Sequence, residues 1–335
     1  MTKVGVYSAL FGLWPILAAA STPVPTYGTY FGGTGDTNAA VAVAVDSAGN
    51  VIMAGYTTSQ TLPGTAHAFQ PTKATGFPDN RDVFIAKFDP TGRNLLWATF
   101  LGGDGDDIPV AVAVDSSSNI YVTGTTDSTN FPLTPHAYLT TPQFAFIAKV
   151  SADGSTLLYS TFLPFDVEPI AGRYRDNALA VNGNGEAYIA GISNNLSAFV
   201  TPGALNIAGT IFLARVNSTG SGLIFGALLG GEGFNGSAVT SLTLDASGNC
   251  YLAGVTGESN VPTTSQALEG RDPNAGLPGK GIGPLNDANS GFLLEVNSTG
   301  SQILYGTYFG LRYYETSITQ ISLGSSGAIY FSGST

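Results

Sequence analysis

One short signature returns along the chain and constrains the fold more than any other feature. Its first copy reads Thr29-Tyr-Phe-Gly-Gly, and related copies begin at Thr99, Thr161, Ala227 and Thr307. Successive copies are spaced 62 to 80 residues apart. Self-similarity at intervals of similar length indicates a repeat architecture, in which each unit buries its apolar surface against its neighbours.

Each interval contains the same four β-rich segments in the same order, which we label a, b, c and d. In the second interval they cover residues 110–115, 120–126, 144–150 and 157–163. Short β-branched and aromatic runs between Gly, Asp, Asn and Ser are typical of strands. Asp46-Ser-Ala-Gly-Asn50 joins a to b, and Asp89-Pro-Thr-Gly92 joins c to d. Both are turn sequences, because Asp accepts backbone N–H groups and Gly tolerates a positive φ.

This order predicts an all-β fold, a β-propeller of four-stranded antiparallel blades. Stacked blades bury both faces of each sheet and leave only short edges. A β-solenoid is the alternative, but solenoid repeats are usually shorter and more regular. We expect a signal peptide at 1–20 and propeller repeats over 21–335, with blade units at about 29–98, 99–160, 161–226 and 227–306 and a partial unit at 307–335.

The repeat resembles the bacterial SBBP-type β-propeller repeat. The resemblance rests on residues 99–106, 113–126 and 144–149, and the second unit matches best. The third unit departs from it, because Thr161-Phe-Leu-Pro-Phe-Asp166 lacks the Gly-Gly pair. The resemblance implies a propeller, usually in exported bacterial proteins, and it implies no catalytic residues and no agreed ligand.

The repeats begin and end with incomplete units. The chain opens on a lone d-like segment at 26–31 and closes on segments a and b at 318–323 and 328–333, which predicts nineteen strands. Closing the ring with the first segment would require it to pair in parallel with the last b strand, which simple closure does not provide. We therefore predict four complete blades plus a partial one, as part of a larger propeller or as a five-bladed ring with a thin last blade.

The N-terminus and the net charge limit where the protein acts and what it binds. Lys3, the apolar run 4–17 and the alanines before Ser21 are typical of a signal peptide, with a membrane anchor as the alternative. We therefore expect a secreted or cell-surface protein with no membrane span after signal removal. The net charge of −11 disfavours binding to nucleic acid, because the phosphate backbone would be repelled.

In a meander blade the d–a and b–c connections emerge on one face, which we call the loop face, and the a–b and c–d turns emerge on the other, the turn face. The d–a connections carry carboxylates that could hold Ca²⁺ through oxygen ligands. The candidates are Asp36, Asp104, Asp106, Asp107 and Glu232. The alternative is a solvated acidic rim, and no connection has the spacing of a known calcium loop.

Other conspicuous residues have architectural explanations. His67 and His136 occupy the same repeat position, so they do not indicate one active site. Cys250 lies in a b segment and is expected to be a buried core residue. Four equivalent residues of segment c are expected to lie along a blade face with their charges in solvent: Lys87, Lys149, Arg215 and Glu295. The sequence predicts no catalytic and no cofactor-binding residue.

These observations predict an exported, non-enzymatic scaffold that binds an unknown protein or glycan through the loop face. One alternative is a polysaccharide-acting hydrolase or lyase that uses carboxylates at the channel mouth, such as Asp106, Asp166 and Glu168. The other alternative is a structural module of a larger cell-surface protein.

Overall fold

All regular structure in the described part of the computed structural model is β-strand. The structure describes residues 27–33, 37–77, 79–165, 177–193, 199–231, 237–257, 259–275, 289–311, 314 and 316–334. Blade 1 consists of β1 (Asn38–Val45), β2 (Val51–Thr57), β3 (Asp82–Phe88) and β4 (Leu95–Leu101). Blade 2 consists of β5 (Asp107–Val114), β6 (Ile120–Thr126), β7 (Ala145–Val150) and β8 (Leu157–Leu163). Both sheets are antiparallel meanders.

The later units repeat this plan with one addition. Blade 3 consists of β9 (Asn177–Val181), β10 (Ala187–Ile192), β12 (Ile211–Val216) and β13 (Leu223–Leu229), with the short β11 (Asn206–Ile207) parallel to β13. Blade 4 consists of β14 (Ala238–Leu244), β15 (Cys250–Thr256), β16 (Ser290–Val296) and β17 (Ile303–Phe309). A two-stranded sheet of β18 (Ser317–Leu323) and β19 (Ile329–Ser334) follows. The predicted fold of four complete blades and a partial one is confirmed.

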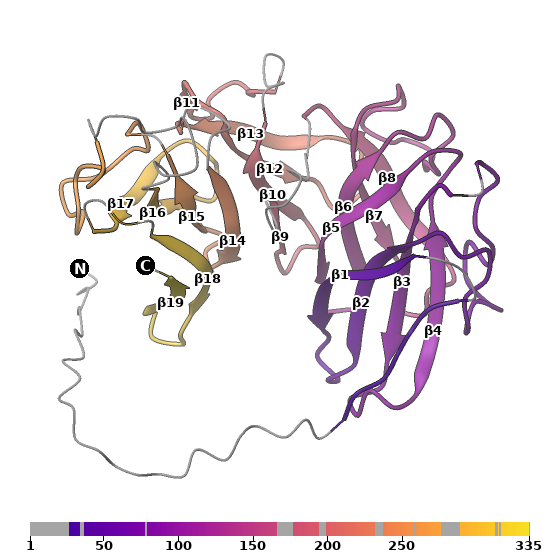
Figure 1. Cartoon of the computed structure of the whole chain (residues 1–335). Helices are drawn as coiled ribbons and strands as arrows, with labels where there is room; N and C mark the ends of the chain where they lie inside the picture. Colours follow the sequence, from indigo (N-terminus) through magenta and orange to yellow (C-terminus); the bar gives the residue numbers. More distant parts are fainter. Residues whose placement is uncertain are drawn as a thin grey trace, which may run out of the picture.

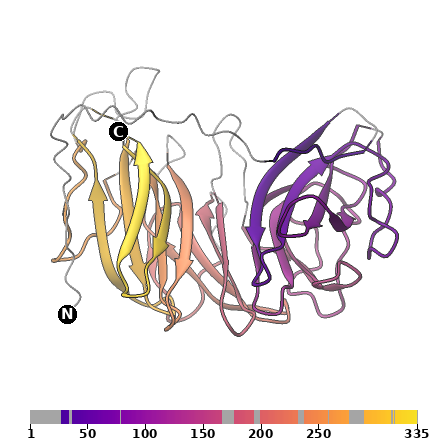
Figure 2. The ribbon, with the colours of Figure 1, turned by 90° about the horizontal axis from the view of Figure 1, so that it is seen from below.

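The blades stand side by side in an open arc. The innermost strands contact one another in the order β1, β5, β9, β14 and β18. Figures 1 and 2 show blade 1 and the β18–β19 pair at opposite ends of this arc. No helix in the described segments is long and apolar enough to cross a lipid bilayer. We call the side of a blade that faces the next blade its forward face, and the other side its back face.

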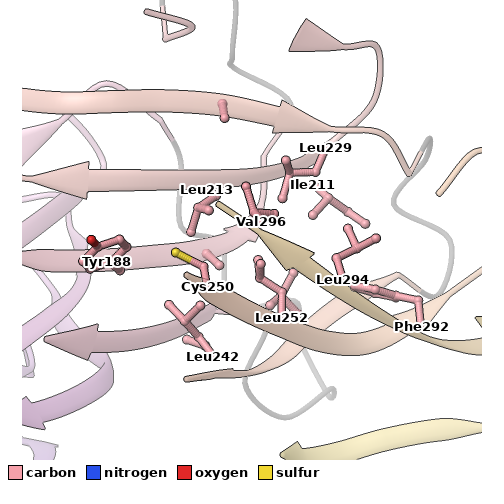
Figure 3. Packing of buried hydrophobic residues seen from close by; sticks show 14 of the residues in the cluster. Tyr188, Ile211, Leu213, Leu229, Leu242, Cys250, Leu252, Phe292, Leu294 and Val296 are labelled. Carbon is pink, nitrogen blue, oxygen red and sulfur yellow. The ribbon is translucent and has the colours of Figure 1, made fainter. Parts of the chain in front are cut away.

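The core consists of apolar layers between successive blades. Between blades 3 and 4, Leu213 on the forward face of blade 3 belongs to the same buried cluster as Leu252 and Phe292 on the back face of blade 4 (Figure 3). Cys250 lies in this layer with no exposed surface, as expected for a core residue. Burial raises the pKa of its thiol to about 12, so the thiol stays protonated and unreactive at neutral pH.

The N-terminal segment 27–33 differs from the prediction, because it forms no strand. Its sequence from Tyr27 to Gly32 is identical to residues 305–310, most of which lie in β17. No described c strand lies beside the segment to pair with it. It instead covers the back face of blade 1, where the Phe31 ring lies 5.3 Å from that of Phe84 and 5.6 Å from that of Phe88. The residue at the position of Phe31 in β4, Leu101, packs in the same way against blade 2.

The b–c connections cover the outer edge of each d strand. In blade 1, Ala98 and Phe100 of β4 donate their N–H groups to the carbonyls of Gly64 and Gln70. In blade 3 the same cover is regular enough to form β11. Because an uncovered edge can pair with another chain, this arrangement protects every complete blade. The b–c connections thus emerge on the loop face and continue along the outer edge of the blade.

A second repeated contact joins each blade to the next. The aromatic ring in strand d lies against the glycine of the following c–d turn, where an added Cβ would come within 2.4–2.5 Å of the ring. The pairs are Trp97 with Gly154, Tyr159 with Gly220, and Phe225 with Gly300. These glycines have φ between 68° and 74°, a region that disfavours side chains. We call each such pair an aromatic–glycine latch.

Candidate functional site

A pocket of about 390 Å³ opens on the loop face between blades 1 and 2. Its walls come from the b–c connection of blade 1, the d–a connection between the two blades, and the b–c connection of blade 2. The lining residues are Phe69, Gln70, Ala74, Thr75, Gly102, Gly103, Asn130 and Pro132. These are the kinds of connection in which the sequence placed the binding face.

Hydrogen bonds fix the walls of this pocket. The side-chain amide of Gln70 donates to the Gly102 carbonyl and accepts from the Gly102 N–H, both at 3.2 Å. Asn130 accepts from the Asp104 N–H at 2.7 Å. A Cβ on Gly103 would lie 2.4 Å from Asn130 Oδ1, so only glycine fits here without movement of the neighbouring side chain. The signature Gly-Gly pair therefore shapes the pocket as well as the connection.

Every residue that lines the pocket is uncharged, and the charged groups lie behind it. Asp82 at the start of β3 and Asp107 at the start of β5 have no exposed surface. Ala74 donates its N–H to Asp82 Oδ2 at 3.0 Å, and Gly103 donates to Asp107 Oδ2 at 2.7 Å. The two carboxyl groups thus anchor the backbone of opposite walls.

Burial shifts the titration of both carboxyl groups. It raises the pKa of Asp107 to about 7, against the lowering effect of hydrogen bonds from its neighbours. It raises the pKa of Asp82 to about 6, where the Ala74 N–H and Lys73 act in the opposite direction. The Lys73 ammonium lies 3.7 Å from Asp82 Oδ1. Asp107 Oδ1 has no hydrogen-bond partner among the described residues.

The carboxylates predicted as calcium ligands are bonded to other groups of the protein. Asp104 accepts from the N–H and the hydroxyl of Thr129, both at 2.7 Å. Asp106 forms an ion pair with Arg81, also accepting from its backbone N–H at 2.8 Å. Asp107, expected on an exposed rim, is the buried first residue of a strand, because β5 begins three residues earlier than the apolar pattern indicated.

Two further candidates, Asp36 and Glu232, lie outside the described residues, as do Asp166 and Glu168. Within the described segments, no three His, Cys, Asp or Glu side chains gather closely enough to hold a metal ion. His67 and His136 are exposed residues of equivalent b–c connections.

The charged residues of segment c differ from the expectation that they keep their charges in solvent. Lys87 forms an ion pair with Asp46 in the a–b turn at 2.9 Å, and both side chains are buried. Lys149 pairs with Asp115 at 3.1 Å, and Arg215 pairs with Glu186. The a–b turn carboxylate at each position therefore binds both its own turn and the c strand. These pairs lie at the turn face of blades 1, 2 and 3.

Sequence reasoning missed Gln70, which lines the pocket, and Lys73 and Asp82, which lie behind its wall. Asp82 alone had a sequence signal, since it begins the repeat motif that continues as Val83-Phe84-Ile85-Ala86-Lys87. Lys73 and Gln70 belong to an irregular connection, whose path no periodicity predicts.

Stacked four-stranded meanders joined in this way define a β-propeller repeat protein. Residues 96–132 match the family model described as SBBP, a β-propeller repeat. This stretch covers most of β4, all of β5 and β6, and the Gly102, Gly103, Asn130 and Pro132 side of the pocket. The resemblance inferred from the sequence is confirmed here. No curated protein sequence matches the chain.

Three solved structures that match this chain in a comparison of backbone shape are as follows. BamB from Moraxella catarrhalis is 11% identical, with 88% of this chain and 85% of that one covered and a TM-score of 0.28. XC5397 from Xanthomonas campestris, described as a gluconolactonase, is 14% identical over 90% and 96% of the two chains, with a TM-score of 0.27. The computationally designed Ika8 protein is 13% identical over 89% and 97%, with a TM-score of 0.22.

Proposed function

We propose that the chain is an exported, non-enzymatic propeller scaffold that binds a protein or glycan through its loop face. The observation that carries this proposal is the pocket between blades 1 and 2. It combines an aromatic ring (Phe69), a side-chain amide (Asn130) and glycine backbone, and a hydrogen bond from the Asp104 N–H fixes the position of the amide. The Nδ2 group of Asn130 donates to no described residue, so it remains available to a ligand acceptor.

The lining favours an uncharged polar ligand. No charged side chain faces the pocket, and the nearest carboxyl groups are buried behind its walls. An aromatic ring supplies apolar contact while amide and backbone groups fix orientation, which is the usual composition of a small-ligand site. A sugar unit of a glycan has this chemistry, and so does an uncharged peptide segment.

The environment of the carboxylates supports binding more than hydrolysis. Asp82 and Asp107 are enclosed, so a substrate would not reach them without rearrangement. Asp104 and Asp106 are held by Thr129 and Arg81. A glycosidase needs two carboxyl groups about 5–10 Å apart on either side of an accessible bond.

The proposal is tested by screening the purified protein against glycan and protein arrays. A ligand that binds in the pocket loses affinity by about tenfold or more in the Asn130→Ala and Phe69→Ala variants. The control is Gln302→Ala, which removes an exposed side chain on the turn face and leaves binding unchanged. Cleavage of a polysaccharide that depends on Asp106 would overturn the non-enzymatic role. Absence of any array ligand would favour the structural module.

A further inference from the structure

The junction between blades 3 and 4 repeats the residues that form the pocket between blades 1 and 2. The pair Gly230-Gly231 follows β13 as the pair Gly102-Gly103 follows β4. Asn260 lies four residues after the end of β15, and Asn130 lies four residues after the end of β6. In both units an apolar residue and a proline come directly after the asparagine. The two junctions can therefore be compared residue by residue.

Between blades 3 and 4, the chain's own backbone fills this place. The b–c connection of blade 3 forms β11 and then passes over Gly230, where a Cβ on Gly209 would come within 2.2 Å of the Gly230 backbone. Gly230 donates its N–H to the Ile207 carbonyl at 3.2 Å. Asn260 donates its Nδ2 group to the next carbonyl, that of Ala208, at 3.3 Å. The occupant is thus a short stretch of backbone that presents two consecutive carbonyl groups.

Between blades 1 and 2, a side chain replaces the first of these carbonyls. Phe69 corresponds to Leu205, since each donates its N–H to the carbonyl of the following latch glycine. Beyond this point blade 1 has the longer connection to its c strand, and it does not form a counterpart of β11. Instead, Oε1 of Gln70 accepts the Gly102 N–H, also at 3.2 Å. The Gln70 amide therefore stands where the first peptide group lies in the other junction.

No described residue takes the place of the second carbonyl. The Nδ2 group of Asn130 donates to no described residue, whereas that of Asn260 is bonded to a main-chain carbonyl. The Asn130 side chain is nevertheless fixed, because its Oδ1 accepts the Asp104 N–H at 2.7 Å. The pocket of about 390 Å³ opens beside it, with Phe69 and Pro132 in its walls. The pocket thus presents a fixed donor where the other junction holds a backbone carbonyl.

We propose that this pocket binds a short extended peptide segment of another protein through a main-chain carbonyl, which accepts the Nδ2 group of Asn130. The inference rests on the proposed binding role of the loop face and narrows its ligand to a peptide. The segment runs parallel to β4, as β11 runs parallel to β13. The residues that enter the pocket are uncharged, because the lining offers no countercharge to a buried ion.

The polar groups of the lining favour a peptide over a sugar. Both polar groups of the Gln70 amide are already bonded to Gly102. Oδ1 of Asn130 already accepts the Asp104 N–H, so the amide offers a ligand mainly its donor. A peptide carbonyl only accepts, whereas a sugar hydroxyl both donates and accepts. Main-chain hydrogen bonds are also the usual source of affinity when an extended peptide joins a sheet.

The test measures binding of a fluorescently labelled peptide, Leu205-Asn-Ile-Ala-Gly-Thr210, with both ends blocked. We expect saturable binding to the purified protein and at least about tenfold weaker binding to Asn130→Asp. This variant keeps Oδ1 for the Asp104 N–H but replaces the donor by an oxygen that repels the peptide carbonyl. The matched control is Gln302→Glu, which makes the same amide-to-carboxylate change at an exposed residue of the turn face and leaves binding unchanged.

A second peptide identifies the carbonyl that is bound. It replaces the amide group between Ala208 and Gly209 by a trans alkene, which keeps the extended shape and removes the acceptor. We expect this peptide to bind the wild type at least about tenfold more weakly than the first peptide does. Asn130→Asp should weaken its binding no further, because the interaction that this substitution removes is already absent.

Equal affinity of the first peptide for the wild type and Asn130→Asp would overturn the inference, once circular dichroism shows that both are folded. Absence of saturable binding up to about 1 mM peptide would overturn it too. An array glycan whose binding is lost in Phe69→Ala would then leave the proposed function standing, with a sugar as the ligand. If neither peptide nor glycan binds, the inference and the proposed function fail together.

Discussion

Asp82 and Asp107 come from neighbouring blades, and their carboxyl groups converge beside Gly102. A Cβ atom on Gly102 would lie 2.6 Å from Cγ of Asp82 and 2.7 Å from Oδ2 of Asp107. Lys73 faces Asp82, whereas the nearby Arg81 is paired with Asp106. Lys73 and Arg81 are therefore taken up by Asp82 and Asp106, and no ion pair of Asp107 is found among the described residues.

Protonation of Asp107 should stabilise the folded protein. The pKa of Asp107 rises from 3.8 to about 7 on folding. Between these values the folded state binds more protons than the unfolded state, so stability falls as pH rises through this range. We expect Asp107→Asn, which stays neutral, to be more stable than the wild type at pH 8 by roughly 1–3 kcal/mol. The two proteins should differ little near pH 4, which urea unfolding at both pH values will measure.

The control for this experiment is Asp106→Asn, which should show the opposite pH dependence. Burial raises the pKa of Asp106, but its bonds to Arg81 lower it further and leave it below its ordinary value. The stabilisation is present above the pKa of the unfolded chain and is lost as pH falls. The variant should therefore be less stable than the wild type at pH 7. Parallel stability curves for Asp107→Asn and the wild type would contradict the assignment of Asp107.

The stability of the folded protein should depend on the ion pair of Lys87 with the buried Asp46 carboxylate. Burial raises the pKa of Asp46, yet hydrogen bonds from Asn50 and Lys87 outweigh it and hold the pKa well below its ordinary range. Lys87→Met leaves an unpaired buried charge and should cost about 2–4 kcal/mol of unfolding free energy. Adding Asp46→Asn should recover part of this loss. If the double variant is no more stable than Lys87→Met, the ion pair is not the cause.

The latch of Trp97 with Gly154 should make that glycine costly to replace. In Gly154→Ala the positive φ costs about 1 kcal/mol, and displacement of the Trp97 ring should add about 1–3 kcal/mol. Gly203→Ala is the matched control, because Gly203 has φ +85° and open space around its Cβ direction. Chemical unfolding of both variants separates the two effects. Equal losses would mean that the ring contributes nothing.

The thiol of Cys250 should resist modification in the folded protein. It has no exposed surface, and its pKa is raised to about 12. A thiol reagent such as Ellman's reagent should therefore react only as fast as the protein opens or unfolds. Rapid labelling in buffer and in denaturant alike would show that the layer between blades 3 and 4 is open in solution.

The fold could be predicted largely because it is local and repeated. Four strand-like segments and two kinds of turn recur, so each unit supports the reading of the others. The prediction failed for the segment 27–33, whose residues Tyr27–Gly32 match β17 in sequence and not in environment. Tyr308 is 1% exposed, whereas Tyr30 is fully exposed. The neighbouring strands determine how exposed these tyrosines are, and the sequence of the segment itself does not show which strands lie beside it.

The candidate site was predicted only in outline. The sequence indicated the loop face and the Gly-Gly signature, because both recur at fixed repeat positions. It did not indicate that Asp107 is buried or that Asp82 reaches it from another blade. Such contacts depend on how two sheets stack. No local sequence pattern within either unit predicts how close Asp82 comes to Asp107. The ion pairs of segment c were missed because each joins a c strand to the a–b turn of the same blade, and these residues lie far apart in the sequence.

The cover that each b–c connection lays over its own d strand has a consequence for how such chains change in length. Each unit includes the b–c connection that covers the outer edge of its own d strand. Its main contacts are with the unit before it and the unit after it. Whole units can therefore be gained by duplication or lost by deletion without uncovering the outer edge of a d strand.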